Sequence, residues 1–192
     1  DGQIELVCGA FSSTAERSLA SGQALHLPEE RCYPDFDTMM NCEAALPEWE
    51  RMDFVAIVTP NHLHFPVAKS ALEKGFHVMS DKPATFSVQE AVELRELVKA
   101  TGLLYGLTHT YTGYPLVKEA RQRVAAGELG KIRKVVVEYS QGWLAGREED
   151  EDNKQADWRL DPERSGVSSC MGDIGVHAAN LAEYVCGLKI TE

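Results

Sequence analysis

The sequence predicts an α/β protein in which helices cover a parallel sheet. Short apolar segments alternate with helix-like segments through the first hundred residues, which is the order that parallel sheets require. The run at 53–59, DFVAIVT, is dominated by apolar residues, as expected of a buried strand. The chain has 192 residues, of which 44% are hydrophobic and 26% are charged, which is typical of a globular protein with a sizeable core.

The chain carries an excess of acidic residues. It has 19 Lys and Arg against 30 Asp and Glu, so its formal net charge is −11 at pH 7. A surface of this sign repels phosphate backbones and anionic lipids, so we expect no nucleic-acid partner and no membrane partner. The sequence shows neither the roughly 20-residue apolar run of a membrane helix nor a secretory leader, so we expect a cytoplasmic protein.

The cysteines predict neither a disulfide framework nor a zinc site. Their number is odd, and the sequence contains no Cys-x-x-Cys pair. No other set of ligands has a recognisable metal-binding spacing, so we expect no metal. The expected state is reduced, buried thiols at Cys8, Cys32, Cys42, Cys170 and Cys186.

Capping and turn residues mark the first elements. After an apolar segment at 4–10, Ser13-Thr14-Ala15-Glu16 has the pattern of a capping box and predicts a helix that Gly22 ends. A short helix is expected after Asp37, and the strand at 53–59 follows it.

Between that strand and residue 108 the alternation continues without a break. Proline marks an early helical position, glycine marks helix ends, and a second capping box, Ser87-Val88-Gln89-Glu90, opens a helix. The predicted elements are a helix that includes Pro66 and ends at Gly75, a strand over 76–80, a helix from Ser87 to Gly102, and a strand over 103–108.

The pattern changes after Tyr114, where we expect a second domain. The expected domain ranges are 1–112 and 113–192. Within the second range the sequence predicts an amphipathic helix over 115–126, a strand over 132–139 and one helix over 172–187.

A polar, irregular stretch occupies 142–169 in this second range. Its acidic run at 148–152 predicts a solvated loop or, alternatively, a lid over a site.

Two turns carry candidate chemistry. Thr59-Pro60-Asn61-His62-Leu63-His64 follows the predicted buried strand, at the edge where open parallel sheets bind ligands. Its Asn and His residues can contact a ribose or a nicotinamide amide, or else cap a helix and lie on the surface. Asp81-Lys82-Pro83 follows the next strand, and its lysine can donate a hydrogen bond to a substrate oxygen or pair with Asp81 on the surface.

Asp173 and His177 form the third candidate. They are four residues apart on the predicted last helix and therefore share one face. A carboxylate one turn from an imidazole can raise the pKa of the imidazole or orient its ring as a base. The alternative is a helix-surface pair that stabilises the helix by a few tenths of a kcal/mol, roughly.

One motif of dinucleotide-binding sheets is missing. A first strand followed by G-x-G-x-x-G lets the backbone approach a pyrophosphate, and no such segment occurs in this sequence. Residues 188–192 have the composition of a strand start. We therefore expect the natural protein to continue beyond both ends.

Taken together, these segments resemble a known family. TPNHLH, DKP, AAGELGKIRKV, WRLDP and GDIGVHAANLAEYVCG, in this order, are similar to the glucose-fructose oxidoreductase and inositol 2-dehydrogenase (Gfo/Idh/MocA) family of NAD(P)-dependent oxidoreductases, over nearly all of the chain. The DKP turn, where the family usually has Glu-Lys-Pro, and the Asp-x-x-x-His helix are the most specific parts. The resemblance implies a Rossmann domain that lacks its first strand and Gly-rich turn here. An α/β domain follows, whose mostly antiparallel sheet lies past residue 192.

The same resemblance implies roles for single residues. Lys82, Asp173 and His177 correspond to the catalytic set, and the lysine approaches both the nicotinamide and the substrate hydroxyl. The implied cofactor contacts are Thr59, Pro60, Asn61, His64, Asp81, Lys82, Pro83, His109, Trp158 and Arg159. The implied substrate contacts are Lys82, Tyr111, Asp173, His177 and Asn180, the last at a position where many members carry Asp.

The choice between NAD and NADP stays open. The family's acidic residue for the adenosine ribose is replaced by Phe11-Ser12-Ser13. The hydroxyls of Ser12 and Ser13, with Arg17 nearby, can accommodate a 2′-phosphate. The resemblance further implies a homo-oligomer.

The predicted function is hydride transfer between a nicotinamide and a secondary alcohol of a sugar, polyol or cyclitol. His177 would accept the hydroxyl proton, Asp173 would hold its ring, and Lys82 would stabilise negative charge on the oxygen. Two alternatives remain: a non-catalytic dinucleotide-binding sensor or interaction protein, and a lyase or glycosidase that uses NAD transiently. The presence of all three residues favours catalysis, since a sensor needs only cofactor contacts.

Overall fold

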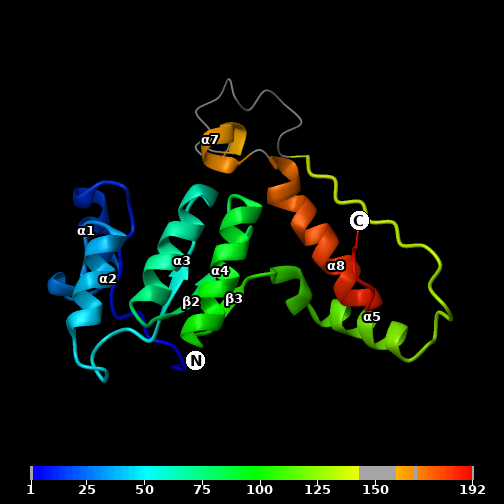
Figure 1. Ribbon diagram of the computed structural model, residues 1–192, viewed down its shortest axis with the longest axis horizontal. Coiled ribbons are helices and arrows are strands. Elements are labelled where there is room, and N and C mark those ends of the chain that lie inside the picture. The colour runs from blue at the N-terminus through cyan, green and yellow to red at the C-terminus, as the bar shows by residue number, and fades with distance from the viewer. Residues whose placement is uncertain (1, 143–158, 167, 192) are drawn as a thin grey trace. The chain divides into compact units, whose positions relative to one another are not determined.

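The computed structural model describes residues 2–142, 159–166 and 168–191 (Figure 1). The chain divides into two compact units. The first contains Asp1–Ile57, Phe65–Met79 and Ala91–Gly106, and the second contains Val58–His64, Ser80–Glu90 and Leu107–Glu192. The second unit therefore gathers the chain segments that follow the three strands, together with the C-terminal helices.

The predicted parallel sheet is confirmed. Its strands are β1 (Phe54–Ile57), β2 (His77–Ser80) and β3 (Tyr105–Leu107), in the spatial order β1-β2-β3. Helices α3 (His64–Glu73) and α4 (Val88–Thr101) connect them, as a parallel arrangement requires (Figure 1). Each strand is shorter than its apolar segment, because only the hydrogen-bonded residues count as strand.

The core of the first unit lies on one face of this sheet. Val55, Ile57 and Val78 are buried, whereas Ala56 and Met79, which point to the opposite face, are exposed. The strand predicted at 53–59 is confirmed over Phe54–Ile57, but its burial is confirmed for one face only within the described part of the chain. The core also takes in buried residues of α3: Val67, Ala68, Ala71 and Leu72.

The two predicted capping boxes have different outcomes. At α4, the Ser87 hydroxyl accepts from the Glu90 N–H at 3.2 Å, and the Glu90 carboxylate accepts from the Phe86 N–H at 2.7 Å and the Ser87 N–H at 3.2 Å. This capping box is confirmed. The one predicted at 13–16 is wrong, because α1 (Ala15–Ala24) starts after Thr14, whose side chain makes no cap bond.

Buried Ser18 fixes the start of α1 instead. Its hydroxyl accepts from the Phe11 N–H at 2.8 Å and donates to the carbonyl of Tyr33. The segment at 4–10 contributes one isolated parallel bridge, between Gly9 and Cys32. Helix α2 (Phe36–Ala45) is capped by Asp35, whose carboxylate accepts from the Thr38 N–H at 2.7 Å. It therefore starts two residues earlier than the start predicted after Asp37.

A polar cluster lies inside the first unit, around Glu43 of α2. The side chain of Glu43 is fully buried. Its carboxylate accepts from Arg31 Nη2 at 2.7 Å, from the Tyr33 hydroxyl at 2.8 Å and from the Met52 N–H at 3.0 Å. Arg31 ends the short helix η1 (Glu29–Arg31). Both carboxylate oxygens therefore have partners, and the cluster joins three separate segments of the unit.

Helices dominate the second unit after Tyr114. Helices α5 (Pro115–Ala125) and α8 (Val176–Cys186) pack together (Figure 1). The Arg121 guanidinium lies 4.4 Å from the ring centroid of Tyr184. The helix predicted over 115–126 is confirmed.

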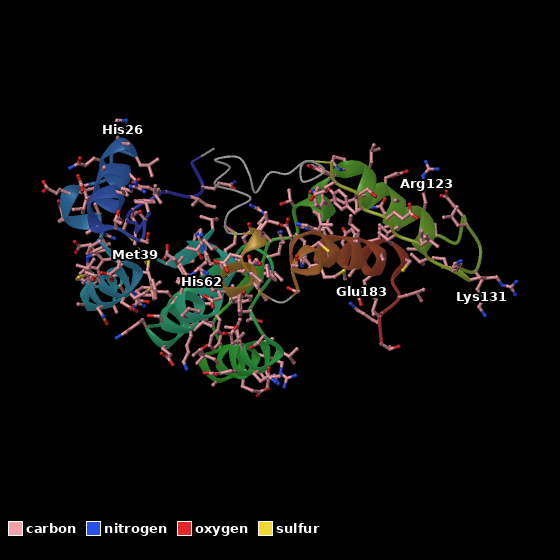
Figure 2. All side chains as sticks on the ribbon, turned by 90° about the horizontal axis from the view of Figure 1, so that it is seen from above. His26, Met39, His62, Arg123, Lys131 and Glu183 are labelled. Atoms are coloured by element: carbon pink, nitrogen blue, oxygen red, sulfur yellow. The ribbon has the colours of Figure 1, made fainter. Side chains whose placement is uncertain are left out.

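The strand predicted over 132–139 is wrong. The segment that Lys131 begins has no regular secondary structure (Figure 2), and the described residues contain no antiparallel sheet. A strand exists only by hydrogen bonding to a neighbour, and the part of the chain that the structure covers provides none for this segment.

The helix predicted over 172–187 begins with a wider turn. A π-helical segment, η5 (Met171–Gly175), runs directly into α8, which ends at Gly187 with a left-handed φ of 71°. Just before it lies the short helix α7 (Pro162–Ser165), where the Asp161 carboxylate accepts from the Glu163 N–H at 2.9 Å. The acidic run at 148–152 and Trp158 lie outside the described residues.

The remaining predictions concern thiols and membranes. All five cysteines are free, as predicted, but Cys42 and Cys170 are exposed and so do not belong to the core. None of the helices that the structure describes combines the length and the apolar character needed to span a membrane.

Candidate functional site

Polar residues of the second unit gather at the turns that follow the three strands and at the last helix. The turns contain η2 (Asn61–Leu63), the segment Asp81–Pro83 and η3 (Thr110–Gly113). The helix contributes Asp173 from η5 and His177 from α8. Ligands of open parallel sheets bind where strands end, so this is the position expected of a site.

Lys82 and Asp173 form the central ion pair. Lys82 Nζ donates to Asp173 Oδ1 at 2.7 Å and to the main-chain carbonyl of Asp173 at 2.5 Å. The two side chains are 13% and 25% exposed. On the other side of the carboxylate, Arg159 Nε lies 3.4 Å from Asp173 Oδ2. An ammonium group has three hydrogens, and among the described residues only Asp173 accepts from it, so one donor remains for a ligand.

The predicted pairing of Asp173 with His177 is wrong. The carboxylate of Asp173 faces Lys82 and Arg159, and His177 Nδ1 has no hydrogen-bond partner among the residues described. A carboxylate gains more from one cationic donor and a second cation nearby than from one neutral imidazole, which explains the difference. The sequence could not show it, because Lys82 lies 91 residues before Asp173.

The electrostatic surroundings of His177 also differ from the prediction. The side chain is buried, and burial lowers its pKa, with further lowering by the positive charge of Lys82 and by His109. The carboxylate of Asp173 acts in the opposite direction but more weakly. His177 is therefore a neutral imidazole at pH 7, able to accept a proton.

Two aromatic residues hold the His177 ring. The ring of Tyr111 meets it edge to face, with centroids 4.6 Å apart, and the ring of His109 does the same at 5.8 Å. A hydrogen bond with Tyr139, aided by burial, raises the pKa of Tyr111 to about 12. The phenol of Tyr111 is therefore neutral at pH 7, and its hydroxyl is no candidate base.

Asp81 builds the turn that presents Lys82. Its Oδ1 accepts from the Lys82 N–H at 2.8 Å and from the Thr108 hydroxyl at 2.9 Å, and the Lys82–Pro83 peptide bond is cis. The ammonium of Lys82 pairs with Asp173 and not with its chain neighbour Asp81. The alternative of a surface ion pair within the DKP turn is therefore excluded.

His64 joins the first two turns. It is buried, with Nδ1 2.6 Å from the Pro83 carbonyl oxygen and Nε2 2.8 Å from the Thr59 carbonyl oxygen. Asn61, also buried, donates from Nδ2 to the carbonyl of Ser165 at 2.9 Å. These contacts lie within the protein, so the two residues shape the site.

Several buried polar atoms of the site lack a partner within the described part of the chain. They are Thr59 Oγ1, His62 Nδ1, His109 Nδ1 and His177 Nδ1. Buried polar atoms are ordinarily hydrogen-bonded, so four in one unit point to a polar ligand. Figure 2 marks His62, which sequence reasoning did not single out as a contact. The position of His62 inside TPNHLH could have indicated a contact, but no sequence pattern shows which ring nitrogen is buried.

An apolar hollow of about 290 Å³ lies on the same unit, beside Pro83. It is lined by Pro83, Ser168, Met171, Gly172, Gly175, Val176 and Ala179. A Cβ at position 172 would lie 2.4 Å from the Ser168 hydroxyl, which would have to rotate away.

The other predicted contacts are placed as follows. Asn180 is half-buried on α8, one turn after His177. Ser12, Ser13 and Arg17 belong to the first unit, at and before the start of α1, where the Ser12 hydroxyl accepts from the Thr14 N–H at 3.3 Å. Ser13 and Arg17 are exposed.

Known proteins resemble the chain along nearly its whole length. Across 190 residues it is 33% identical to the uncharacterized oxidoreductase YfiI of Bacillus subtilis (strain 168), an alignment that covers 98% of this chain and 48% of that protein. It also resembles crystal structures of an inositol dehydrogenase homolog from Azotobacter vinelandii. The form with NAD+ has a TM-score of 0.91 at 37% identity and covers 96% of this chain and 46% of that one. The form with NADH and myo-inositol has a TM-score of 0.86 at 35% identity, covering 96% and 45%.

The chain thus spans about half the length of the relatives it matches. Residues 2–109 match an oxidoreductase family described as having an NAD-binding Rossmann fold, and residues 117–192 match the GFO/IDH/MocA C-terminal domain. The parallel sheet and the first two turns lie in the first matched range, which contains Lys82, and Asp173 lies in the second. The chain belongs to the GFO/IDH/MocA family of oxidoreductases.

Proposed function

We propose that the chain carries the catalytic residues of an NAD(P)-dependent dehydrogenase that acts on a secondary alcohol of a sugar, polyol or cyclitol. The observation that carries this proposal is the combination of a Lys82 ammonium with one free donor and a neutral, buried His177 in the same unit. The family and the resemblance to an inositol dehydrogenase homolog bound to myo-inositol support the class of substrate.

The polar atoms of the turns fit a nicotinamide nucleoside. Thr59 Oγ1 and His62 Nδ1 are buried and unpartnered among the described residues, which suits hydrogen bonds to an amide or to ribose hydroxyls. When bound, NAD or NADP would supply the acceptor for the hydride. Ser12, Ser13 and Arg17 are our candidates for the adenosine end, where their hydroxyl and guanidinium groups suit a 2′-phosphate.

His177 acts as the base in this proposal. A neutral imidazole with an unpartnered nitrogen can accept the proton of the reacting hydroxyl as the hydride leaves the same carbon. The protonated ring then stands near Lys82, and the carboxylate of Asp173 offsets the added positive charge.

Lys82 acts on the oxygen. Its remaining N–H donor can hydrogen-bond to the hydroxyl oxygen and stabilise the negative charge that develops there. Asp173 holds the ammonium in place through two acceptors, its side chain and its own carbonyl. The role of Asp173 is therefore to orient Lys82, which differs from the ring-holding role that the sequence predicted.

Absorbance of reduced cofactor tests the proposal. The intact protein is incubated with NAD or NADP and a panel that includes myo-inositol, D-glucose and levoglucosan. We expect reduced cofactor with at least one member, and a rate about 10²- to 10³-fold lower in a Lys82→Met variant, which keeps the length of the side chain without its donors.

The two rival functions give different results in this assay. A sensor binds the cofactor without producing its reduced form. A lyase or glycosidase releases product without net reduction. Either result would replace the proposed function.

A further inference from the structure

Thr108 is a half-buried residue of the second unit to which the proposed mechanism gives no role. It follows β3 directly, as Asp81 follows β2, and the two strands are neighbours in the sheet. The Thr108 N–H donates to the carbonyl of Ser80 at 2.9 Å, so the pairing of the two strands continues past the end of β3. Thr108 is therefore held next to the turn that contains Lys82.

The hydroxyl of Thr108 binds the side chain of Asp81. It donates to Asp81 Oδ1 at 2.9 Å, and the same oxygen accepts from the Lys82 N–H at 2.8 Å. Hydrogen bonds to a carboxylate are stronger than those between neutral groups, and Thr108 and Asp81 are both half-buried, where water competes less. One carboxylate oxygen thus joins the residue after β3 to the main chain of Lys82.

The other anchors of this turn hold its two ends. The Asp81 carbonyl accepts from the preceding serine hydroxyl at 3.0 Å, and the Pro83 carbonyl oxygen lies 2.6 Å from His64 Nδ1. At the centre of the turn, the Lys82 N–H donates to the Asp81 carboxylate. Because Thr108 binds the same carboxylate, its hydroxyl links the centre of the turn to the third strand.

The segment that begins with Thr108 also contacts the proposed base. The next residue, His109, packs its ring edge to face on that of His177, with centroids 5.8 Å apart. Thr108 is therefore connected to both groups on which the proposed reaction depends. Its side chain holds the Lys82 turn, and its chain neighbour contacts His177. A shift of the turn relative to this segment would change the placement of the ammonium relative to the imidazole.

We propose that the Thr108 hydroxyl is a positioning group, which holds the Lys82 turn in place through the Asp81 carboxylate and so aligns Lys82 with His177. This proposal rests on the proposed function, in which both side chains act on one substrate hydroxyl. It gives the Asp81 side chain a role within the turn, whereas the family resemblance implied a contact with the cofactor. A reacting group displaced by about 1 Å can cost about 100-fold in rate, so losing this hydrogen bond should lower turnover.

The test compares the wild type with Thr108→Val and Thr108→Ser in the intact protein. Valine keeps the branched shape and the main-chain N–H but removes the hydroxyl, whereas serine keeps the hydroxyl and lacks the methyl group. Thr101→Val is the matched control, because it removes a hydroxyl that donates to the Leu97 carbonyl at 2.9 Å, at the end of α4. The substrate is the panel alcohol with the highest turnover.

We expect kcat to fall roughly 10- to 100-fold in Thr108→Val, with the KM of the cofactor unchanged. Thr108→Ser should recover most of that loss, because the hydroxyl is what binds Asp81. Thr101→Val should match the wild type. The melting temperature of each variant separates a loss of turnover from a loss of folded protein.

Chemical labelling of Lys82 gives a second readout that does not depend on turnover. Its side chain is 13% exposed and paired with Asp173, so reductive methylation of its amine should be slow in the wild type without cofactor. In Thr108→Val we expect a severalfold faster rate at this residue, measured by mass spectrometry, because a displaced turn loosens the ion pair. Lys69, which is 39% exposed, is the internal reference and should react at the same rate in both proteins.

Four outcomes of the kinetic and labelling measurements would overturn the proposal. An unchanged kcat in Thr108→Val would mean that the hydroxyl positions nothing. Equal losses in the valine and serine variants would assign the effect to side-chain shape. A raised KM of the cofactor with an unchanged kcat would assign the bond to cofactor binding. A lower kcat without faster labelling would place the effect away from Lys82.

Failure of the proposed function gives a different result. A wild type that reduces no cofactor with any panel alcohol would remove the proposed reaction. The labelling rates of Lys82 would then decide alone whether the Thr108 hydroxyl holds this turn, with faster labelling in Thr108→Val supporting it and an equal rate overturning it.

Discussion

Each unit of the chain contains a carboxylate beside an arginine, fully buried at Glu43 and half-buried at Asp173, and the two clusters differ in what they leave unpaired. In the first unit, both oxygens of Glu43 are bound, by Arg31, by the Tyr33 hydroxyl and by a backbone N–H. In the second, Asp173 is bound by Lys82 and lies 3.4 Å from Arg159, but the neighbouring His177 keeps an unpartnered nitrogen within the described structure. The carboxylate of Glu43 therefore has all its acceptors bound, although Arg31 Nε has no partner among the described residues, whereas the cluster around Asp173 leaves a histidine nitrogen without a partner. We call the first the closed cluster and the second the open cluster.

Only the open cluster contains a group that can take part in acid–base chemistry at pH 7. Near Glu43, burial raises the pKa of Cys8 to about 12 and raises the pKa of Tyr33 as well, so both groups stay protonated and unreactive at pH 7. At the open cluster, burial lowers the pKa of His177 and leaves a base ready to accept a proton. We therefore expect substitutions in the first cluster to change stability and substitutions in the second to change turnover.

Replacing His177 by Asn should give the largest effect. The amide removes the base but keeps a polar side chain of similar size, so we expect turnover to fall about 10²- to 10⁴-fold. The affinity for the cofactor and the melting temperature should change little, because the nitrogen that is lost has no partner in the described structure. Steady-state kinetics with a cofactor titration measures both quantities. Equal turnover in the variant would refute the role of His177.

The pH profile sharpens the same contrast. A base works only when it is unprotonated, and the pKa of His177 lies below the ordinary value of 6.5. The kcat/KM of the wild type should therefore fall to half of its plateau at a pH below 6.5. This decline should be missing from the residual activity of His177→Asn. A midpoint above pH 6.5 would show that another group is the base.

The sequence predicted the parts of this contrast that depend on local pattern. The sheet, the capping box at Ser87 and the candidates Lys82 and His177 follow from segments of fewer than about 20 residues, where period and turn chemistry decide. The partner of Asp173 did not follow, because Lys82 and Arg159 approach it from other parts of the chain. The strand predicted at 132–139 failed for a related reason, since an apolar alternation cannot supply the neighbour that a strand needs.

Replacing Glu43 by Gln tests the closed cluster. Glutamine keeps the shape of the side chain but leaves the guanidinium of Arg31, whose side chain is only 14% exposed, without its counter-charge. Breaking a buried ion pair in this way costs about 3 kcal/mol of unfolding free energy. Chemical denaturation of the intact protein measures the loss. Turnover per folded molecule should match the wild type, and a selective loss of turnover would contradict the division between the two clusters.

The smallest effect is expected from an exposed ion pair in the first unit, which carries the same charges as the clusters but none of their burial. Lys69 Nζ lies 2.5 Å from Glu93 Oε1, with side chains 39% and 52% exposed. Water and salt screen such a pair, and ordering two long side chains offsets most of the attraction. Lys69→Ala should therefore leave the melting temperature and the turnover indistinguishable from the wild type, at low and at high salt. A salt-dependent drop in melting temperature as large as that of Glu43→Gln would contradict this prediction. It would mean that exposed ion pairs stabilise this chain as much as buried ones do.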